Sequence, residues 1–207
     1  MELSVSILNA SDKKKTIDIL NDADISYIHL DVMDGNFVSK KSLPLEEINE
    51  LVAITKKRID IHLMVSNPIE YIENIEKSKN IEYITIHLEI EKDIKETLLK
   101  IKSYGYKAGL SIKPNTDINK LLPYLEYIDL ILLMTVEPGL GGQPFMETSI
   151  EKINQLKKLV DNKIKIEVDG GINNITINSV KKADIAVVGS YITTSENMIE
   201  KIKELKV

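Results

Sequence analysis

The stretch Ile128-Asp129-Leu130-Ile131-Leu132-Leu133 is a short and almost continuous apolar run. Such a run is typical of a strand in a parallel sheet that is covered on both faces. Similar apolar, β-branched runs recur along the chain, with polar amphipathic segments between them. The predicted strands are Leu3–Leu8, Tyr27–Met33, Ile59–Val65, Tyr83–Glu89, Lys107–Pro114, Ile128–Val136, Ile164–Val168 and Ile185–Ser190.

Strands that alternate with helices indicate parallel pairing through right-handed crossovers. Eight such units that close on themselves form a (β/α)8 TIM barrel. The competing fold, an open doubly wound sheet, usually has a glycine-rich turn after its first strand, whereas here Asn9-Ala10-Ser11-Asp12 follows. We therefore predict an α/β protein with a single (β/α)8 barrel domain over residues 1–207. Helices are expected at Leu45–Lys56, Pro68–Lys79, Asp93–Tyr104, Thr148–Val160, Ile175–Lys182 and Asn197–Lys206.

The composition argues against several partners. The net charge is −5, and the 27 basic residues are scattered, which argues against a nucleic-acid or anionic-membrane surface. No apolar run has the length of a membrane span, and the first residues read as a strand rather than a signal peptide. The lack of cysteine excludes disulfides and thiolate metal sites, and agrees with a cytoplasmic protein.

Arg58 is the only arginine in the sequence. A bidentate guanidinium clamp on a phosphate group is therefore not expected. Any phosphate would be held by backbone amides, helix N-termini or lysine.

The second predicted strand has an unusual polar face. In Ile28-His29-Leu30-Asp31-Val32-Met33-Asp34-Gly35, the side chains alternate between two faces. His29, Asp31 and Met33 thus point one way, and Leu30, Val32 and Asp34 the other. An imidazole and a carboxylate on one face suit a catalytic surface better than a core.

Other polar residues end neighbouring strands, where the chemistry of such barrels is located. His62 and His87 end two predicted strands, and Asp169 ends another. With His29 and Asp31, the residues His62 and Asp169 offer nitrogen and carboxylate ligands suited to Zn²⁺, Mn²⁺ or Fe²⁺. The alternative is a set of structural histidines with a proton-shared aspartate pair and no metal.

Six of the nine glycines follow the last three predicted strands, and three methionines end strands. The glycine loops expose backbone N–H groups that can converge on a phosphate, although glycines can also merely turn the chain. Methionine usually fills gaps in a core, but here it could also form a dry lining over the metal. The glycines are Gly139, Gly141, Gly142, Gly170, Gly171 and Gly189, and the methionines are Met33, Met64 and Met134.

Five motifs in order resemble the ribulose-phosphate 3-epimerase family. They are Ser6-Ile7-Leu8, His29-Leu30-Asp31-Val32-Met33-Asp34-Gly35, Asp60-Ile61-His62-Leu63-Met64-Val65, Met134-Thr135-Val136-Glu137-Pro138-Gly139 with Gly141-Gly142-Gln143, and Val168-Asp169-Gly170-Gly171-Ile172. The resemblance extends from the first strand to Gly189-Ser190. It implies a barrel of the ribulose-phosphate-binding type that interconverts D-ribulose 5-phosphate and D-xylulose 5-phosphate, a reaction of the pentose phosphate pathway.

The resemblance also implies roles for individual residues. A divalent ion (Zn, Fe, Mn or Co) would be bound by His29, Asp31, His62 and Asp169, and the two aspartates would be the acid/base pair. The substrate, a small phosphorylated ketose, would be contacted by Ser6, His62, Met33, Met64 and Met134, and its phosphate by Gly139, Leu140, Gly141, Gly142, Gly170, Gly171, Gly189 and Ser190. Members of the family form dimers or hexamers, so a homo-oligomer is expected.

The chemistry explains why two aspartates are needed. The C3 hydrogen of the ketose is acidified by the adjacent carbonyl, and a metal ion stabilises the enediolate. Inversion requires removal of the proton from one face and its return to the other, hence two opposed acid/bases. Asp31 and Asp169 can take these roles, whereas Asp34, on the other face of its strand, is expected to orient a loop.

Other functions remain open from the sequence. A 3-epimerase of a ketohexose 6-phosphate such as D-allulose 6-phosphate is the nearest, because the chain departs from the family pattern at Asn9-Ala10-Ser11, Ser39–Leu43 and Tyr191–Thr194. A decarboxylase of the orotidine-phosphate type would need an Asp-x-Lys-x-x-Asp pattern, which no strand end has. A non-catalytic phosphosugar-binding barrel would not need both Asp31 and Asp169.

Overall fold

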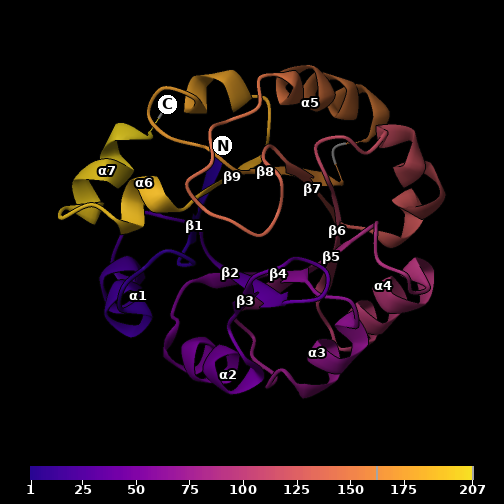
Figure 1. Ribbon diagram of the computed structural model, residues 1–207, viewed down its shortest axis with the longest axis horizontal. Coiled ribbons are helices and arrows are strands. Elements are labelled where there is room, and N and C mark those ends of the chain that lie inside the picture. The colour runs from indigo at the N-terminus through magenta and orange to yellow at the C-terminus, as the bar shows by residue number, and fades with distance from the viewer. Residues whose placement is uncertain (162, 207) are drawn as a thin grey trace.

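The computed structural model describes residues 1–161 and 163–206, and eight of its strands form a closed parallel barrel. The order around the barrel is β1-β2-β4-β5-β6-β7-β8-β9, and β9 pairs with β1 (Figure 1). This confirms the predicted (β/α)8 fold. The barrel strands are β1 (Glu2–Ser6), β2 (Tyr27–Asp34), β4 (Arg58–Met64), β5 (Ile81–His87), β6 (Lys107–Ile112), β7 (Leu130–Met134), β8 (Lys165–Asp169) and β9 (Ile185–Val188).

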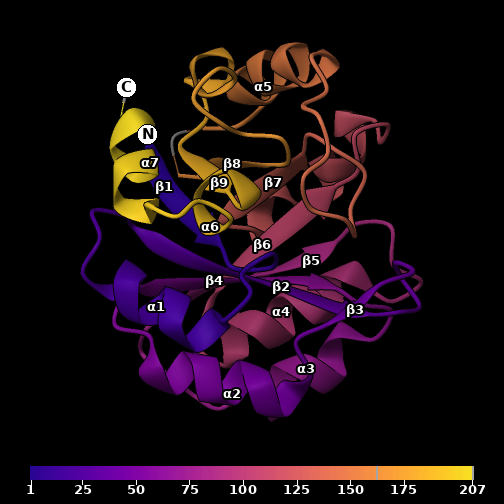
Figure 2. The same cartoon turned by 60° about the vertical axis from the view of Figure 1, so that its left-hand side comes forward.

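A ring of helices covers the outside of the barrel (Figures 1 and 2). The α-helices are α1 (Lys13–Asn21), α2 (Leu45–Ile54), α3 (Pro68–Asn74), α4 (Ile94–Ser103), α5 (Thr148–Leu159), α6 (Ser190–Thr193) and α7 (Met198–Glu204). Two 3₁₀ helices, η1 (Ile118–Tyr127) and η2 (Ile177–Val180), occupy the crossovers after β6 and β8.

Several of these segments differ from the prediction: α1 and α6 were not among the expected helices, and Ser190, which begins α6, was expected to end a strand. The segment η1 was not predicted, and its Pro123 lacks the N–H group that an α-helix would use. The helix expected at Ile175–Lys182 is reduced to η2, because the Asn173 side chain accepts from the amides of Ile175 and Thr176 and forms a competing turn. The helix expected at Pro68–Lys79 ends at Asn74, since the next residue is extended.

The apolar stretch that predicted the sheet is buried on both faces. In β7, Ile131 and Leu133 belong to the main core between barrel and helices, whereas Leu130 and Leu132 fill the barrel interior. In β2 the predicted alternation also holds, since Leu30 and Val32 pack in the main core and the His29 and Asp31 side chains meet inside the barrel.

Arg58 closes the N-terminal end of the barrel. Its guanidinium lies 4.0 Å from the centroid of the Tyr27 ring, donates to the Tyr27 hydroxyl at 2.7 Å and pairs with Glu2 and Glu82. The Tyr27 and Tyr83 rings lie 6.0 Å apart and are almost fully buried. The only arginine therefore stabilises the end of the barrel opposite to the strand termini where chemistry was predicted.

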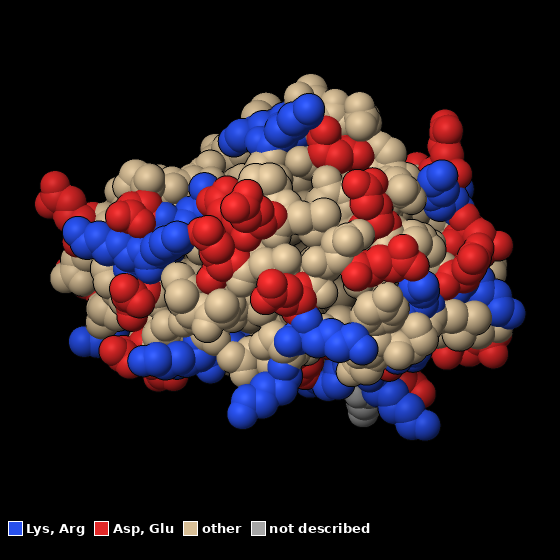
Figure 3. All heavy atoms as spheres, turned by 90° about the horizontal axis from the view of Figure 1, so that it is seen from below, with Lys and Arg blue, Asp and Glu red and all other residues tan. Residues whose placement is uncertain are grey.

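Charges of both signs lie side by side on one face of the surface. Figure 3 shows lysine, arginine, aspartate and glutamate side chains interspersed over one face of the molecule. Across residues 1–161 and 163–206, none of the helices has both the length and the apolar character of a membrane span.

Candidate active site

Two histidines and two aspartates meet at the C-terminal end of the barrel. Ligand atoms of His29, Asp31, His62 and Asp169 all lie within 4.8 Å of one another. Oδ1 of Asp31 is 3.4 Å from Nε2 of His29 and 3.4 Å from Nδ1 of His62. The structure thus brings together the four residues predicted as metal ligands.

The cluster fits a divalent cation. Both histidines are fully buried, yet Nε2 of His29 and Nδ1 of His62 have no hydrogen-bond partner among the described residues. Buried polar nitrogens are nearly always satisfied, so two that face one carboxylate indicate a place for a ligand. Two imidazole nitrogens and two carboxylates are a donor set for Zn²⁺, Fe²⁺ or Mn²⁺.

Further hydrogen bonds orient these side chains. Nδ1 of His29 lies 2.7 Å from Oδ2 of Asp60, which leaves Nε2 to face the cluster. Ser6 donates from Oγ to Oδ2 of Asp31 at 2.6 Å, which leaves Oδ1 to face the two histidines. Partners that fix the ligating atom in this way are typical of metal sites.

The carboxyl groups and His29 have strongly shifted pKa values. Burial and the nearby Asp31 raise the pKa of Asp169 to about 7. Burial acts against the charged form of Asp31 too, but His29 and His62 outweigh it and lower the pKa of Asp31. Burial would lower the pKa of His29, whereas Asp60 and Asp31 raise it well above the ordinary value. Without a cation, these shifts favour a proton on Asp169 and a second ring proton on His29.

Three glycine-bearing loops converge beside the cluster. A Cβ atom on Gly171 would lie 2.4 Å from the Phe145 amide nitrogen, and Gly142 approaches the Ser190 hydroxyl. A Cβ atom on Gly189 would lie 3.5 Å from Cβ of Ser6. The loop after β8 therefore packs against the backbone of the loop after β7, which in turn approaches Ser190 after β9, and the N–H groups of these loops can surround a small anion.

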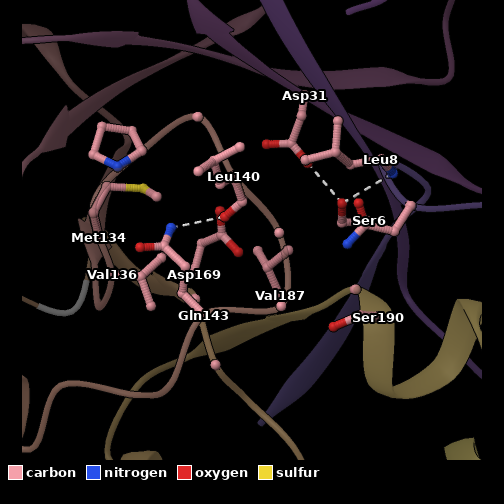
Figure 4. A pocket seen from close by; sticks show the side chains of 18 of the residues that line it. Ser6, Leu8, Asp31, Met134, Val136, Leu140, Gln143, Asp169, Val187 and Ser190 are labelled. Carbon is pink, nitrogen blue, oxygen red and sulfur yellow. Dashed lines mark hydrogen bonds between the residues drawn. The ribbon is translucent and has the colours of Figure 1, made fainter. Parts of the chain in front are cut away.

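One pocket joins the carboxylates to these loops. Figure 4 shows the Asp31 and Asp169 side chains directed into it from different strands, with the Ser6–Asp31 hydrogen bond on one side. No lysine or arginine lines it in the described part of the chain. The predicted site residues that line it are Ser6, Asp31, Met33, Met64, Met134, Gly139, Leu140, Gly141, Gly142, Asp169, Gly170, Gly171, Gly189 and Ser190.

Asp34 points away from this pocket, as its position in the strand predicted. Its carboxylate accepts from the amides of Asn36 and Phe37 and from the amide and hydroxyl of Ser66. Burial would raise the pKa of Asp34, but these hydrogen bonds outweigh burial and lower it to about 2. The residue holds two loops at the mouth of the barrel.

The departures from the family pattern lie at different distances from the pocket. Asn9 lines it and lies against Gly141. Ser42, in the short strand β3 (Lys41–Ser42) that pairs with the end of β2, donates to the backbone oxygen of Asp31 at 2.6 Å. The Tyr191 hydroxyl instead contacts Glu204 in α7.

Sequence reasoning missed the residues behind the ligands. Asp60 holds His29, and Glu167 is fully buried beside it with both carboxylate oxygens unpartnered among the described residues. Burial and Asp60 raise the pKa of Glu167 well above its usual value, which favours the neutral carboxyl. The alternation of side chains held the signal, because Asp60 and Glu167 each precede a predicted ligand by two positions.

Comparisons of sequence point to one group of proteins. The model of the ribulose-phosphate 3 epimerase family matches residues 2–193. The cytoplasmic isoform of ribulose-phosphate 3-epimerase from Oryza sativa subsp. japonica is 37% identical over 186 residues, which cover 87% of this chain and 81% of that protein. The ribulose-phosphate 3-epimerase from Aquifex aeolicus (strain VF5) is 38% identical over 185 residues, which cover 86% of this chain and 82% of that protein.

Solved structures with low sequence identity share the fold. A tryptophan synthase alpha-subunit from Pyrococcus furiosus superposes with a TM-score of 0.75 at 18% identity, covering 99% of this chain and 97% of that chain. The 3-hexulose-6-phosphate synthase from Salmonella typhimurium gives a TM-score of 0.69 at 16% identity, and the match covers 99% of this chain and 96% of that chain. At these identities the likeness extends to the barrel alone.

Proposed function

This chain belongs to the ribulose-phosphate 3-epimerase family and is a carbohydrate epimerase, and from that premise we propose that it interconverts D-ribulose 5-phosphate and D-xylulose 5-phosphate with Asp31 and Asp169 as acid/base pair. The observation that carries the proposal is the meeting of these two carboxyl groups in one pocket, beside two buried histidine nitrogens without hydrogen-bond partners among the described residues.

The two aspartates suit opposite roles in one turnover. Asp31 has a lowered pKa and favours the ionised form, whereas Asp169, with a pKa of about 7 before a metal ion binds, holds a proton more readily. Carboxyl groups whose surroundings shift their pKa values apart are typical of acid/base pairs. They come from β2 and β8, which β1 and β9 separate in the barrel, so they can reach opposite faces of a bound sugar.

A metal ion would bind to His29, Asp31, His62 and Asp169. When bound, a divalent cation supplies positive charge close to the sugar oxygens, which stabilises the negative charge that develops as the C3 proton leaves. Ser6 holds Asp31 in position, and Met33, Met64 and Met134 limit water around the reacting carbon.

The glycine loops and Ser190 are proposed to hold the phosphate group. Because no basic side chain lines the pocket in the described residues, backbone N–H groups of Gly142, Gly171 and Gly189, with the Ser190 hydroxyl, would supply the donors. The open carbon chain of the sugar would then lie between this end of the pocket and the carboxylates.

The chain as a whole is proposed to be one catalytic barrel domain that works in the cytoplasm as a homo-oligomer, a dimer or a hexamer. The rice relative named as a cytoplasmic isoform supports the location. Sedimentation velocity of the purified protein measures the assembly, and a monomer would contradict this part of the proposal.

The test is exchange of solvent deuterium into C3. D-ribulose 5-phosphate incubated with the protein in D₂O is expected to gain deuterium at C3 and to form D-xylulose 5-phosphate. Elemental analysis of the same sample is expected to find a divalent metal. D-allulose 6-phosphate serves as the comparison substrate, and a higher kcat/KM with that hexose would overturn the proposed specificity.

A further inference from the structure

His87 is the third histidine of the chain, and it has no part in the proposed reaction. It ends β5, is fully buried and lies behind His62 as seen from the metal site. Nε2 of His87 is 2.9 Å from Nε2 of His62, and the two rings stack with centroids 4.9 Å apart. The nitrogen of His62 that faces the metal site, Nδ1, is on the other side of its ring.

Glu89 binds the far side of the His87 ring. Its Oε2 lies 3.1 Å from Nδ1 of His87, and its Oε1 accepts from the Lys113 amide and the Thr116 hydroxyl. Burial would raise the pKa of Glu89, but hydrogen bonds from His87, Lys113 and Thr116 outweigh it and lower that pKa to about 2. Glu89 is therefore ionised and can only accept hydrogen bonds.

The hydrogen bonds then determine which ring nitrogen of His62 and of His87 carries the proton. The 2.9 Å contact between the two Nε2 atoms needs one donor and one acceptor, so only one of these nitrogens carries a proton, and a neutral imidazole carries one proton in all. The ionised Glu89 requires the His87 proton on Nδ1, which leaves Nε2 of His87 as an acceptor. The contact between the two rings then requires the His62 proton on Nε2, and Nδ1 of His62 keeps a free lone pair.

We propose that Glu89 and His87 are positioning residues that select the tautomer of His62 in which Nδ1 can bind a metal ion. The inference rests on the proposed function only where it takes His62 as a metal ligand. In the opposite tautomer, lone pairs on Nδ1 of His87 and Oε2 of Glu89 would face each other at 3.1 Å, and a proton would block Nδ1 of His62.

Glu89→Gln tests the role of the hydrogen bond between Glu89 and Nδ1 of His87. A glutamine can donate to Nδ1 of His87, which moves the His87 proton to Nε2 and the His62 proton to Nδ1. We expect Zn²⁺ affinity, measured by competition with a chromogenic chelator, to fall about 10- to 100-fold. The matched control is Glu126→Gln, because Glu126 is exposed in η1 and has no hydrogen bond or ion pair among the described residues; its Zn²⁺ affinity is expected to be unchanged.

His87→Gln and His87→Leu separate positioning from packing. The two side chains have similar size, but only glutamine can accept the proton of His62 Nε2. We expect the leucine variant to bind Zn²⁺ more weakly than the glutamine variant. Equal affinity of both variants and wild type would show that His87 only fills space.

Nitrogen NMR of ¹⁵N-histidine-labelled protein reads the tautomers directly, and it does not depend on any variant folding. Only three imidazoles contribute to the spectrum. Metal-free wild type is expected to show the proton of His62 on Nε2 and that of His87 on Nδ1. A His62 proton on Nδ1, or an unchanged Zn²⁺ affinity in folded Glu89→Gln, would overturn the proposal. Loss of metal binding in Glu89→Gln without any C3 exchange by wild type would instead contradict the proposed function alone.

Discussion

The hydroxyl of Ser6 donates a 2.6 Å hydrogen bond to Oδ2 of Asp31, so that Oδ1 is the oxygen that faces His29 and His62. The bond fixes the rotation of the carboxylate that is proposed to bind both the metal ion and the substrate proton. Hydrogen bonds to charged groups contribute more free energy than hydrogen bonds between neutral groups.

Ser6→Ala is therefore expected to lower kcat about tenfold, the equivalent of roughly 1.4 kcal/mol. Ser4→Ala is the matched control, because Ser4 lies two positions earlier on β1, is fully buried, and its hydroxyl has no hydrogen-bond partner among the described residues. Steady-state kinetics on ribulose 5-phosphate measure both. Equal losses in the two variants would contradict a specific role of Ser6.

Asp31→Asn and Asp169→Asn should each slow epimerisation by about 10²- to 10⁴-fold, because each removes one of the two proton carriers. Each variant is expected to exchange the C3 hydrogen of no more than one epimer. Asp18→Asn, an identical change at an exposed position of α1, is the control. Circular dichroism checks folding, and intact interconversion in both folded site variants would exclude the two-aspartate mechanism.

Metal affinity should depend on pH in a direction set by Asp169 and His29. In the metal-free site Asp169 holds a proton below about pH 7, which is its pKa, and His29, whose pKa is raised, keeps its second ring proton to a higher pH than an ordinary histidine. A metal ion must displace these protons, so affinity is lost as pH falls below about 7, by about tenfold per pH unit for each proton displaced. Chelator competition between about pH 5.5 and 8 measures the slope. A flat profile would mean that neither proton is released.

Gly171→Ala is expected to reduce kcat/KM about 10- to 100-fold by displacing the loop after β7. The new Cβ would lie 2.4 Å from the Phe145 amide nitrogen, and the backbone has a φ of +67°. Gly105→Ala is the control: its φ is +90°, but a Cβ there would meet no atom within 4 Å. Both variants should lose about 1 kcal/mol of stability from the positive φ, and only Gly171→Ala should lose activity. Thermal unfolding and kinetics on ribulose 5-phosphate separate the two effects.

The alternation of side chains in a strand made much of the site predictable. It directed His29 and Asp31 into the barrel and Asp34 away from it, and the structure agrees. The same rule points Asp60 and Glu167 inward, but a sequence cannot tell which inward carboxylate reaches a histidine nitrogen. That depends on the register between neighbouring strands, such as the pairing of His29 with Asp60.

Helix type and helix ends were less predictable. The apolar spacing of residues 118–127 is disturbed by Pro123, and the competing Asn173 turn before η2 depends on one side-chain rotamer. The position of His87 behind His62 likewise depends on the β4–β5 pairing, which includes an irregularity between Ile59 and Asp60. Local composition contains none of this information.

The closure of the barrel by Arg58, Tyr27 and Tyr83 has a kinetic consequence. Since apolar side chains such as Leu130, Leu132 and Ile185 fill the interior beneath the carboxylates, the two epimers must enter and depart through the same opening. Product and substrate thus compete for one vacant pocket and exclude each other. Each sugar phosphate should inhibit conversion of the other in a purely competitive manner, and net flux should follow the concentrations on the two sides of the reaction.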